Sequence, residues 1–176
     1  MNYWHYGPYN GINIYNPYNY PIPSWAMIPA SNPDHWGDYI ELKDYGPNPF
    51  VVNIKQATKQ NNTFRTALWT GKHLQITLMS INMGEDIGLE MHPNTDQFIR
   101  IEQGQALVLM GDKKDNLNFQ KRVYQGCAIV IPAGKWHNVI NIGYSPLKLY
   151  SIYAPPEHPH GTVHRTKKEA EEHDHK

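Results

Sequence analysis

The feature that most constrains the fold is a series of short runs between residues 64 and 154, rich in β-branched and aromatic residues and each ended by glycine, asparagine, aspartate or proline. Runs of this length and composition predict β-strands rather than helices. Many short strands separated by turn residues are typical of an all-β sandwich or barrel. The predicted strands cover residues 65–69, 74–81, 87–92, 97–102, 105–110, 118–124, 128–131, 137–141 and 148–153.

The chain of 176 residues is long enough for one well-filled core, so a single barrel domain is expected. The barrel is predicted for residues 64–154. The rest of the sequence divides into an N-terminal arm of residues 1–33, a connecting segment of residues 34–63 and an extended C-terminal tail of residues 155–176. A short helix is predicted near residues 38–43, and the charged residues 167–176 are predicted to be either a frayed helix or a disordered end.

The arm contains no Asp, Glu, Lys or Arg and is rich in tyrosine, proline and asparagine. Repeated prolines fix φ and remove backbone donors, so the arm is expected to be irregular rather than helical. Two interpretations remain open. The arm is either a strap whose rings pack on the barrel or on a neighbouring subunit, or an assembly segment.

Composition excludes several classes of partner. Sixteen basic residues balance sixteen acidic ones, so neither nucleic acid nor an anionic membrane surface is an expected partner. Cys127 is the only cysteine, which indicates a reducing compartment and predicts a cytoplasmic protein. Five of the ten histidines lie in the C-terminal tail, where they are expected to be solvated.

Four polar side chains are predicted to enter the barrel together. Glu90 and His92 are two residues apart, so on a strand they point to the same side. Gln97 begins the next strand, and His137 begins another after the turn at residues 132–134. Two imidazoles with a carboxylate suit Fe(II) and also accept Zn, Mn or Ni, so the set predicts a site for one divalent metal of undetermined identity.

The same residues lie in two segments that resemble the motifs of the cupin superfamily. Residues 84–104 are similar to the first cupin motif, in which a glycine precedes His-x-His, a carboxylate and a closing glycine. Here Glu90 stands where the leading histidine usually is, and Gln97 stands where the glutamate usually is. Residues 126–141, Gly-x5-Pro-x-Gly-x2-His-x3-Asn, resemble the second motif in full.

This resemblance implies a double-stranded β-helix, a jelly-roll-like barrel, with one metal ion held by Glu90, His92 and His137. Gln97 is expected either as a fourth ligand or as a residue that orients a ligand or a bound water. Glu90 and Gln97 are the expected catalytic residues, because they are placed to handle protons beside the metal. The resemblance also implies a homodimer, since cupin barrels commonly pair through their sheets.

Two classes of function follow from the resemblance. The first is a metalloenzyme acting on a small polar molecule by sugar isomerase-like or dioxygenase-like chemistry. The second is a non-catalytic binding or structural cupin, for which the tyrosine-rich arm suggests an assembly or spore-associated role. The residues alone leave the choice between an enzyme and a binding protein open.

Overall fold

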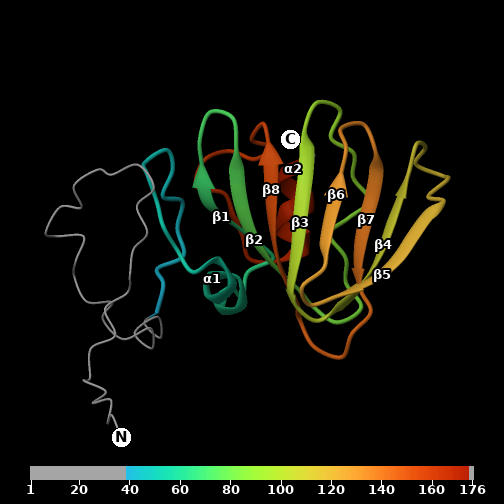
Figure 1. The fold of residues 1–176 in the computed structure, drawn as a ribbon, viewed down its shortest axis with the longest axis horizontal. Coiled ribbons are helices and arrows are strands. Elements are labelled where there is room, and N and C mark those ends of the chain that lie inside the picture. The colour runs from blue at the N-terminus through green and yellow to red at the C-terminus, as the bar shows by residue number, and fades with distance from the viewer. Residues whose placement is uncertain (1–38, 175–176) are drawn as a thin grey trace, which may run out of the picture. The chain divides into compact units, whose positions relative to one another are not determined.

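The structure is a computed structural model that describes residues 39–174, so the arm predicted for residues 1–33 lies outside the described part. The described elements are antiparallel strands with a helix before and after them (Figure 1). In chain order they are α1 (Ile54–Gln60), β1 (Arg65–Thr70), β2 (Gln75–Ile81), β3 (Asp96–Gln103), β4 (Gln105–Gly111), β5 (Phe119–Tyr124), β6 (Ala128–Ile131), β7 (Trp136–Asn141), β8 (Leu147–Ala154), β9 (Val163–His164) and α2 (Lys167–Asp174).

The strands of the described part form a six-stranded sheet, in the order β6-β3-β8-β2-β1-β9, and a three-stranded sheet, in the order β5-β4-β7. From β3 onward the chain passes back and forth between the two sheets, as a double-stranded β-helix requires. The first passage is a tight reversal at Gly104, which has a φ of +95° that side-chain-bearing residues rarely adopt. The all-β jelly-roll barrel expected from the sequence is therefore confirmed.

The main core fills the space between the two sheets. The larger sheet contributes Met79, Ile99 and Leu149, and the smaller sheet contributes Val108 and Val139, all of them buried. These residues alternate with residues on the opposite face of each strand, as the two-residue period predicts. Side chains that share this inward face therefore lie inside the barrel.

A second apolar layer covers the outer face of the larger sheet. Residues 39–53 form neither helix nor strand and turn at residues 46–48, and Tyr45 N joins the segment to β1 by donating to Leu68 O at 2.9 Å. Helix α1 follows, with the Asn53 side chain accepting a hydrogen bond from Gln56 N as its N-cap. Ala57 packs with Leu68 of β1 in this layer.

Two local predictions are wrong. The helix predicted near residues 38–43 is absent from the described residues 39–43, where the Gln60 side chain bonds both the N–H and the carbonyl of Ile40, and the helix forms at Ile54–Gln60 instead. Residues 87–92 are not a strand, because Gly88 has a φ of +97° and donates its N–H to Asp86 Oδ1 at 2.7 Å. No helix within residues 39–174 is long and apolar enough to span a membrane.

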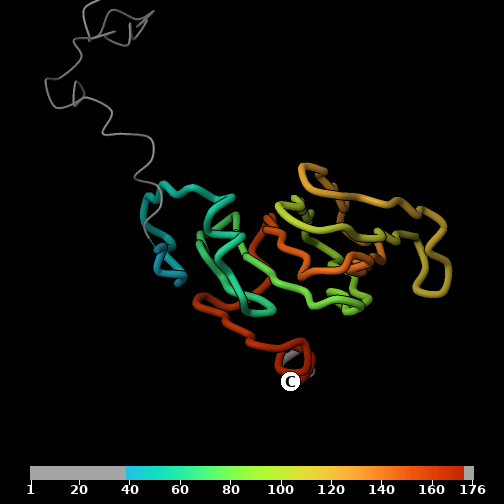
Figure 2. The backbone as a smooth tube through the Cα atoms, turned by 90° about the horizontal axis from the view of Figure 1, so that it is seen from below, coloured from blue at the N-terminus to red at the C-terminus, as the bar shows by residue number. Residues whose placement is uncertain are grey.

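The C-terminal segment returns to the barrel (Figure 2). Strand β9 pairs with β1, and His164 is buried, so the prediction that the tail histidines are solvated is wrong at this position. The buried Gln75 side chain fastens the preceding stretch: its Oε1 accepts from His158 N at 2.9 Å and its Nε2 donates to His158 O at 2.8 Å. The tail is therefore part of the folded unit, and α2 forms its end.

Candidate metal centre

Glu90 and His137 are directly opposite each other in an isolated antiparallel bridge. Glu90 N donates to His137 O at 3.1 Å, and His137 N donates to Glu90 O at 2.9 Å. Opposite residues of an antiparallel pair project to the same side, so the bridge aims the carboxylate and the imidazole at one point. The strand predicted for residues 87–92 was expected to direct Glu90 into the barrel, and this bridge directs it there in the absence of the strand.

His92 is joined to the same place by the turn before β7. Its carbonyl oxygen accepts a hydrogen bond from Gly134 N at 2.8 Å, so the segment after Glu90 and the turn that leads to His137 are fastened together. The two motif segments therefore meet through backbone hydrogen bonds, which leaves their side chains free for the interior.

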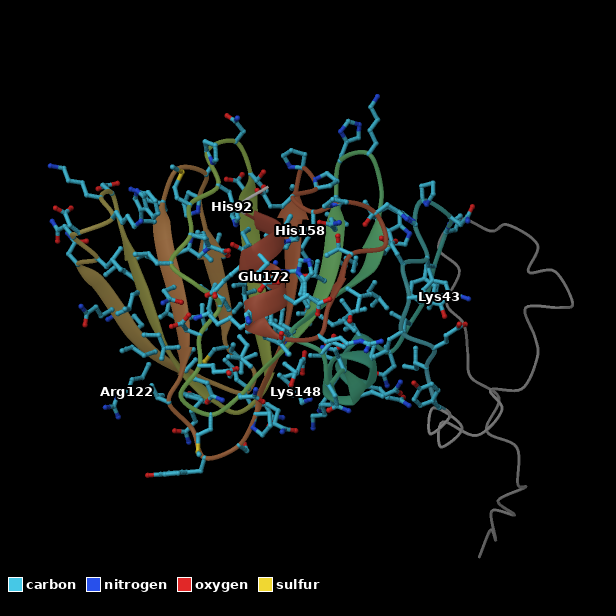
Figure 3. All side chains as sticks on the ribbon, turned by 180° about the vertical axis from the view of Figure 1, so that it is seen from behind. Lys43, His92, Arg122, Lys148, His158 and Glu172 are labelled. Atoms are coloured by element: carbon cyan, nitrogen blue, oxygen red, sulfur yellow. The ribbon has the colours of Figure 1, made fainter. Side chains whose placement is uncertain are left out.

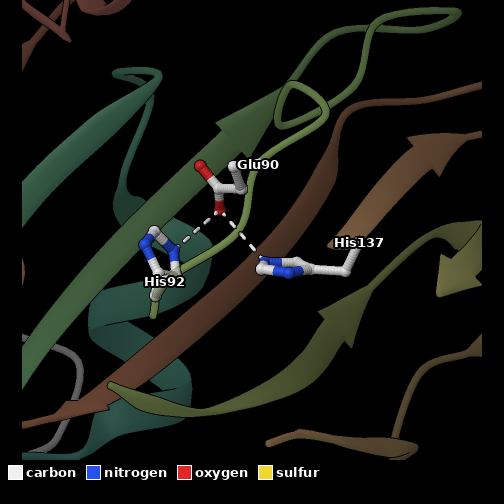
Figure 4. A group of neighbouring side chains, drawn as sticks. All are labelled: Glu90, His92 and His137. Carbon is white, nitrogen blue, oxygen red and sulfur yellow. Dashed lines mark ion pairs between the residues drawn. The ribbon is translucent and has the colours of Figure 1, made fainter. Parts of the chain in front are cut away.

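The ligand atoms of these residues converge (Figure 4). Glu90 Oε1 lies 3.4 Å from His92 Nε2 and 3.3 Å from His137 Nε2. One ligand atom from each of the three residues lies within 4.8 Å of the other two. Both histidines are buried, and neither Nε2 has a hydrogen-bond partner among the described residues.

The other nitrogen of each ring is held by an acceptor. His137 Nδ1 lies 3.0 Å from the carbonyl oxygen of Lys135, and His92 Nδ1 lies 3.1 Å from Glu157 Oε1. Because both partners accept hydrogen bonds, Nδ1 carries the proton in each neutral ring, and a lone pair on Nε2 faces the carboxylate. Fixing of the tautomer by an outer carboxylate or carbonyl is the usual arrangement of metal-ligating histidines.

Three lone-pair-bearing atoms that face one another repel unless a proton or a metal ion lies between them. Ligands about 2.1 Å from a tetrahedral cation are separated from each other by about 3.4 Å, which matches the two carboxylate–imidazole distances of 3.4 and 3.3 Å. The residues present therefore fit a divalent metal, and the donor set matches the two-histidine, one-carboxylate sites of non-haem Fe(II).

The electrostatics of the site favour an ionised Glu90. Burial alone would raise the pKa of Glu90, but the adjacent rings of His137 and His92 and the positive charge of Arg65 outweigh it and lower the pKa. For His92, burial is likewise outweighed by Glu90 and Glu157, so its pKa is raised. A carboxylate that stays charged is the form that a metal requires.

Gln97 lies on β3 directly opposite Tyr153 of β8, so both side chains point to the same side of the sheet. The ring of Tyr153 packs edge-on against His92, with centroids 5.7 Å apart, so Gln97 also faces the site. Its Nε2 donates to Ser151 Oγ at 2.9 Å, and its Oε1 is buried without a partner among the described residues. Whether Gln97 binds the metal or orients a ligand stays a prediction, as do the catalytic roles of Gln97 and Glu90.

Other residues at the site were not identified from the sequence. Arg65 is buried at the start of β1, and Glu157 contacts His92 from the C-terminal segment. His158 packs against the Tyr153 ring and lies at the same end of the strands as His92, opposite the end that carries Arg122 (Figure 3). Burial, followed by the positive charge of Arg65, lowers the pKa of His158 to about 3, so this ring is neutral near pH 7.

Comparisons with known proteins agree with this architecture. The family model for the cupin domain matches residues 77–153, which include all four predicted ligands. The uncharacterized protein YrkC of Bacillus subtilis is 74% identical over 129 residues, covering 73% of this chain and 69% of YrkC. An uncharacterized protein of Acanthamoeba polyphaga mimivirus is 44% identical over 115 residues, covering 65% of this chain and 70% of the relative.

A solved structure supports the fold directly. The crystal structure of a protein from Bacillus halodurans is 65% identical to this chain and superposes with a TM-score of 0.73. The match covers 74% of this chain and 98% of the other. With the double-stranded β-helix, the two motif segments joined at one site and the matching family model, the chain belongs to the cupin superfamily.

Proposed function

We propose that this protein is a metal-dependent cupin that binds one divalent cation through Glu90, His92 and His137 and acts on a small polar molecule. The observation that carries the proposal is the unpaired Nε2 of each buried histidine beside the Glu90 carboxylate, with each Nδ1 held by a separate acceptor. The bound metal would act as a Lewis acid or as an activator of O₂.

The chain's own residues favour dioxygenase-like chemistry over sugar isomerisation. Isomerisation through an enediol needs a side chain that moves a proton between neighbouring carbons. Gln97 is an amide and does not exchange a proton near neutral pH. Glu157 also contacts the ligand set, but its carboxylate accepts the Nδ1 proton of His92 and is therefore occupied. Sugar isomerisation stays the alternative reaction, and ligand storage without catalysis stays the alternative function.

In the proposed reaction the protein binds and orients the substrate. The free Oε1 of Gln97 would accept a hydrogen bond from a substrate hydroxyl or a bound water, since its amide is fixed by Ser151. The rings of Tyr153 and His158 wall this end of the interior, with centroids 5.2 Å apart, and limit the access of water to the bound molecule.

Metal content tests the first part of the proposal. Full-length protein is purified without chelators, incubated with Fe(II) under anaerobic conditions or with Mn, Ni or Zn, and assayed by elemental analysis. We expect about one ion per chain in wild type and a loss of about tenfold or more in affinity for His92→Ala, His137→Ala and Glu90→Ala. His73→Ala, which removes an exposed histidine, is the matched control and should keep the wild-type content.

Oxygen consumption tests the second part. The Fe(II)-loaded protein is supplied with small hydroxy acids and phenols in an oxygen electrode, and the Zn- or Mn-loaded protein is supplied with aldoses. Oxygen uptake coupled to substrate loss, absent from His137→Ala, supports the dioxygenase reading. Aldose–ketose conversion without oxygen uptake supports the isomerase instead, and a metal-loaded protein inactive in both assays supports a binding cupin.

A further inference from the structure

A cavity of 560 Å³ reaches the candidate metal centre from the side of α2. It is lined by Glu90, by Arg65 at the start of β1 and by Lys167 of α2. Figure 3 views the molecule from this side, with α2 in front of the strands. A cavity of this volume is in the range that accommodates small-molecule ligands.

Arg65 is the unusual residue of this cavity. It is 1% exposed, and no carboxylate oxygen among residues 39–174 lies within salt-bridge distance of its guanidinium. Its contacts are weak: Nη1 lies 3.5 Å from His164 Nδ1, and the guanidinium lies 5.6 Å from the centroid of the Phe64 ring. Its Nε has no hydrogen-bond partner among the described residues. Buried cations are normally paired, so this one is available for an anion.

The strand register places Arg65 inside the barrel with the site. Arg65 is opposite Met79, a residue of the main core, and Thr77 on the same strand shares the face of Met79. The Thr77 hydroxyl is also buried without a partner among the described residues, as is Gln97 Oε1. Unpaired polar atoms of the barrel interior therefore lie on the same inward side of the larger sheet as Arg65, whereas the cavity itself joins Arg65 to Glu90.

The balance of charge indicates the sign of that molecule. If the proposed metal is bound, the cation and Arg65 supply three positive charges, whereas Glu90 and Glu157 supply two negative ones. The charges that α2 adds to the cavity lining cancel, because they come from two lysines and two glutamates: Lys167, Lys168, Glu171 and Glu172. Gln97 adds none, because an amide stands where cupins usually have a glutamate. One positive charge is left. In the metal-free protein the negative charge of Glu90 acts on Arg65, and a metal bound to Glu90 would neutralise that charge.

We propose that the ligand of this site is a small monocarboxylate, and that the buried Arg65 guanidinium anchors its carboxylate group while another polar group of the same molecule reaches the metal. The planar guanidinium fork matches a carboxylate in a bidentate geometry, which favours it over a neutral amide of the same shape. One leftover positive charge also favours a monoanion over a phosphate dianion. This inference rests on the proposed function, because it names the substrate class of the same metal centre.

Titration calorimetry on the full chain tests the inference with three probes: glycolate, its neutral counterpart glycolamide, and inorganic phosphate. We expect metal-loaded wild type to bind glycolate about tenfold or more tightly than glycolamide, with phosphate weaker than glycolate. Arg65→Gln should abolish the preference for glycolate over glycolamide while the metal content stays at the wild-type level. Arg65→Lys should retain part of the preference, since it keeps the charge and loses the fork. Lys72→Gln, which removes an exposed charge between β1 and β2 and outside the cavity lining, is the control and should bind like wild type.

Elemental analysis of the same samples separates this inference from the metal proposal. Loss of metal from wild type contradicts the proposed function, whereas metal-loaded wild type that binds glycolamide as well as glycolate overturns only the anchor. If wild type holds no metal, the titration on the metal-free protein decides: an Arg65-dependent preference for glycolate over glycolamide supports the anchor, and its absence overturns it. If Arg65→Gln does not fold, the thermal shift of wild type with glycolate against glycolamide decides: a larger shift with glycolate supports the anchor, and equal shifts overturn it.

Discussion

Gln75 and Glu157 together determine how His92 is presented to the metal centre. Gln75 Oε1 accepts hydrogen bonds from the backbone N–H groups of Glu157 and His158, and this fixes the stretch that carries the Glu157 carboxylate. That carboxylate holds His92 Nδ1 at 3.1 Å. Glu157 is therefore a positioning residue, because it orients the His92 ring and would affect a bound metal only through that ring.

Replacing Glu157 by Gln should weaken metal binding without unfolding the barrel. The amide removes the charged acceptor of His92 Nδ1, and loss of such a partner typically reduces metal affinity by about ten- to a hundredfold. Chelator competition measures the affinity, and thermal melting of the metal-free protein checks the fold. Glu41→Gln, whose side chain is 68% exposed and lies outside the cavity lining, is the matched control. Wild-type metal affinity in Glu157→Gln would show that the contact with His92 has no role in the site.

At the scale of elements, the sequence predicts what depends on local pattern and misses what depends on tertiary contact. The strands from β1 to β8 were predicted close to their observed bounds, because alternation and turn residues are local signals. Helix α1 is an exception: it is not predicted although its signal is local, with Asn53 as a recognisable N-cap followed by helix-forming residues. Glu157 and His158 are not predicted for the site, because they reach it only through the return of the C-terminal segment to the barrel. Arg65 is not predicted either, because its inward face follows from the pairing of β1 with β2.

A buried carboxylate adds to the hydrogen bonds that fasten the segment before α1 to β1. The Asp44 side chain is 1% exposed and accepts hydrogen bonds from Thr70 N, Thr70 Oγ1 and Gly161 N, so it joins this segment to both β1 and the C-terminal segment. Burial alone would raise the pKa of Asp44, but these hydrogen bonds outweigh it and lower the pKa. A carboxyl group whose pKa is lower in the folded than in the unfolded state stabilises the fold above its unfolded pKa.

We therefore expect Asp44→Asn to lower the free energy of unfolding by about 1–3 kcal/mol at pH 7. The stabilisation by Asp44 should be complete above about pH 4 and should be lost as the pH falls through the lowered pKa of the folded state. Urea denaturation at pH 7, 5, 4 and 3 should show a difference between wild type and Asp44→Asn that shrinks at acid pH. Asp112→Asn, whose side chain is 80% exposed, is the control. A difference that stays constant across the pH series would contradict the assignment.

At the scale of the whole molecule, the outer face of the larger sheet carries an apolar groove of 530 Å³ beside residues 50–54. Leu68, Ile76 and Ile152 line it, and the neighbouring Val51 is 87% exposed. Exposed apolar surface of this kind commonly marks an interaction site. We propose that a second copy of this chain packs on the groove, which gives the homodimer that the sequence resemblance implies.

Light scattering at micromolar concentrations should then give the mass of two 20.3 kDa chains. Val51→Asp should shift the protein to monomers, because it places a charge at the packed face while removing no buried side chain. Tyr144→Ser, at a fully exposed tyrosine in the β7–β8 connection, is the control and should stay dimeric. A wild-type monomer would contradict the dimer, and a dimeric Val51→Asp would contradict this choice of face.

The central claim is the metal itself, and anomalous X-ray scattering tests it most directly. Crystals of wild type purified without chelators, or soaked with the metal that elemental analysis identifies, are measured on both sides of that metal's absorption edge. We predict one anomalous peak per chain, bounded by Glu90 Oε1, His92 Nε2 and His137 Nε2. No peak at this position, or a peak held by other residues, would contradict the account.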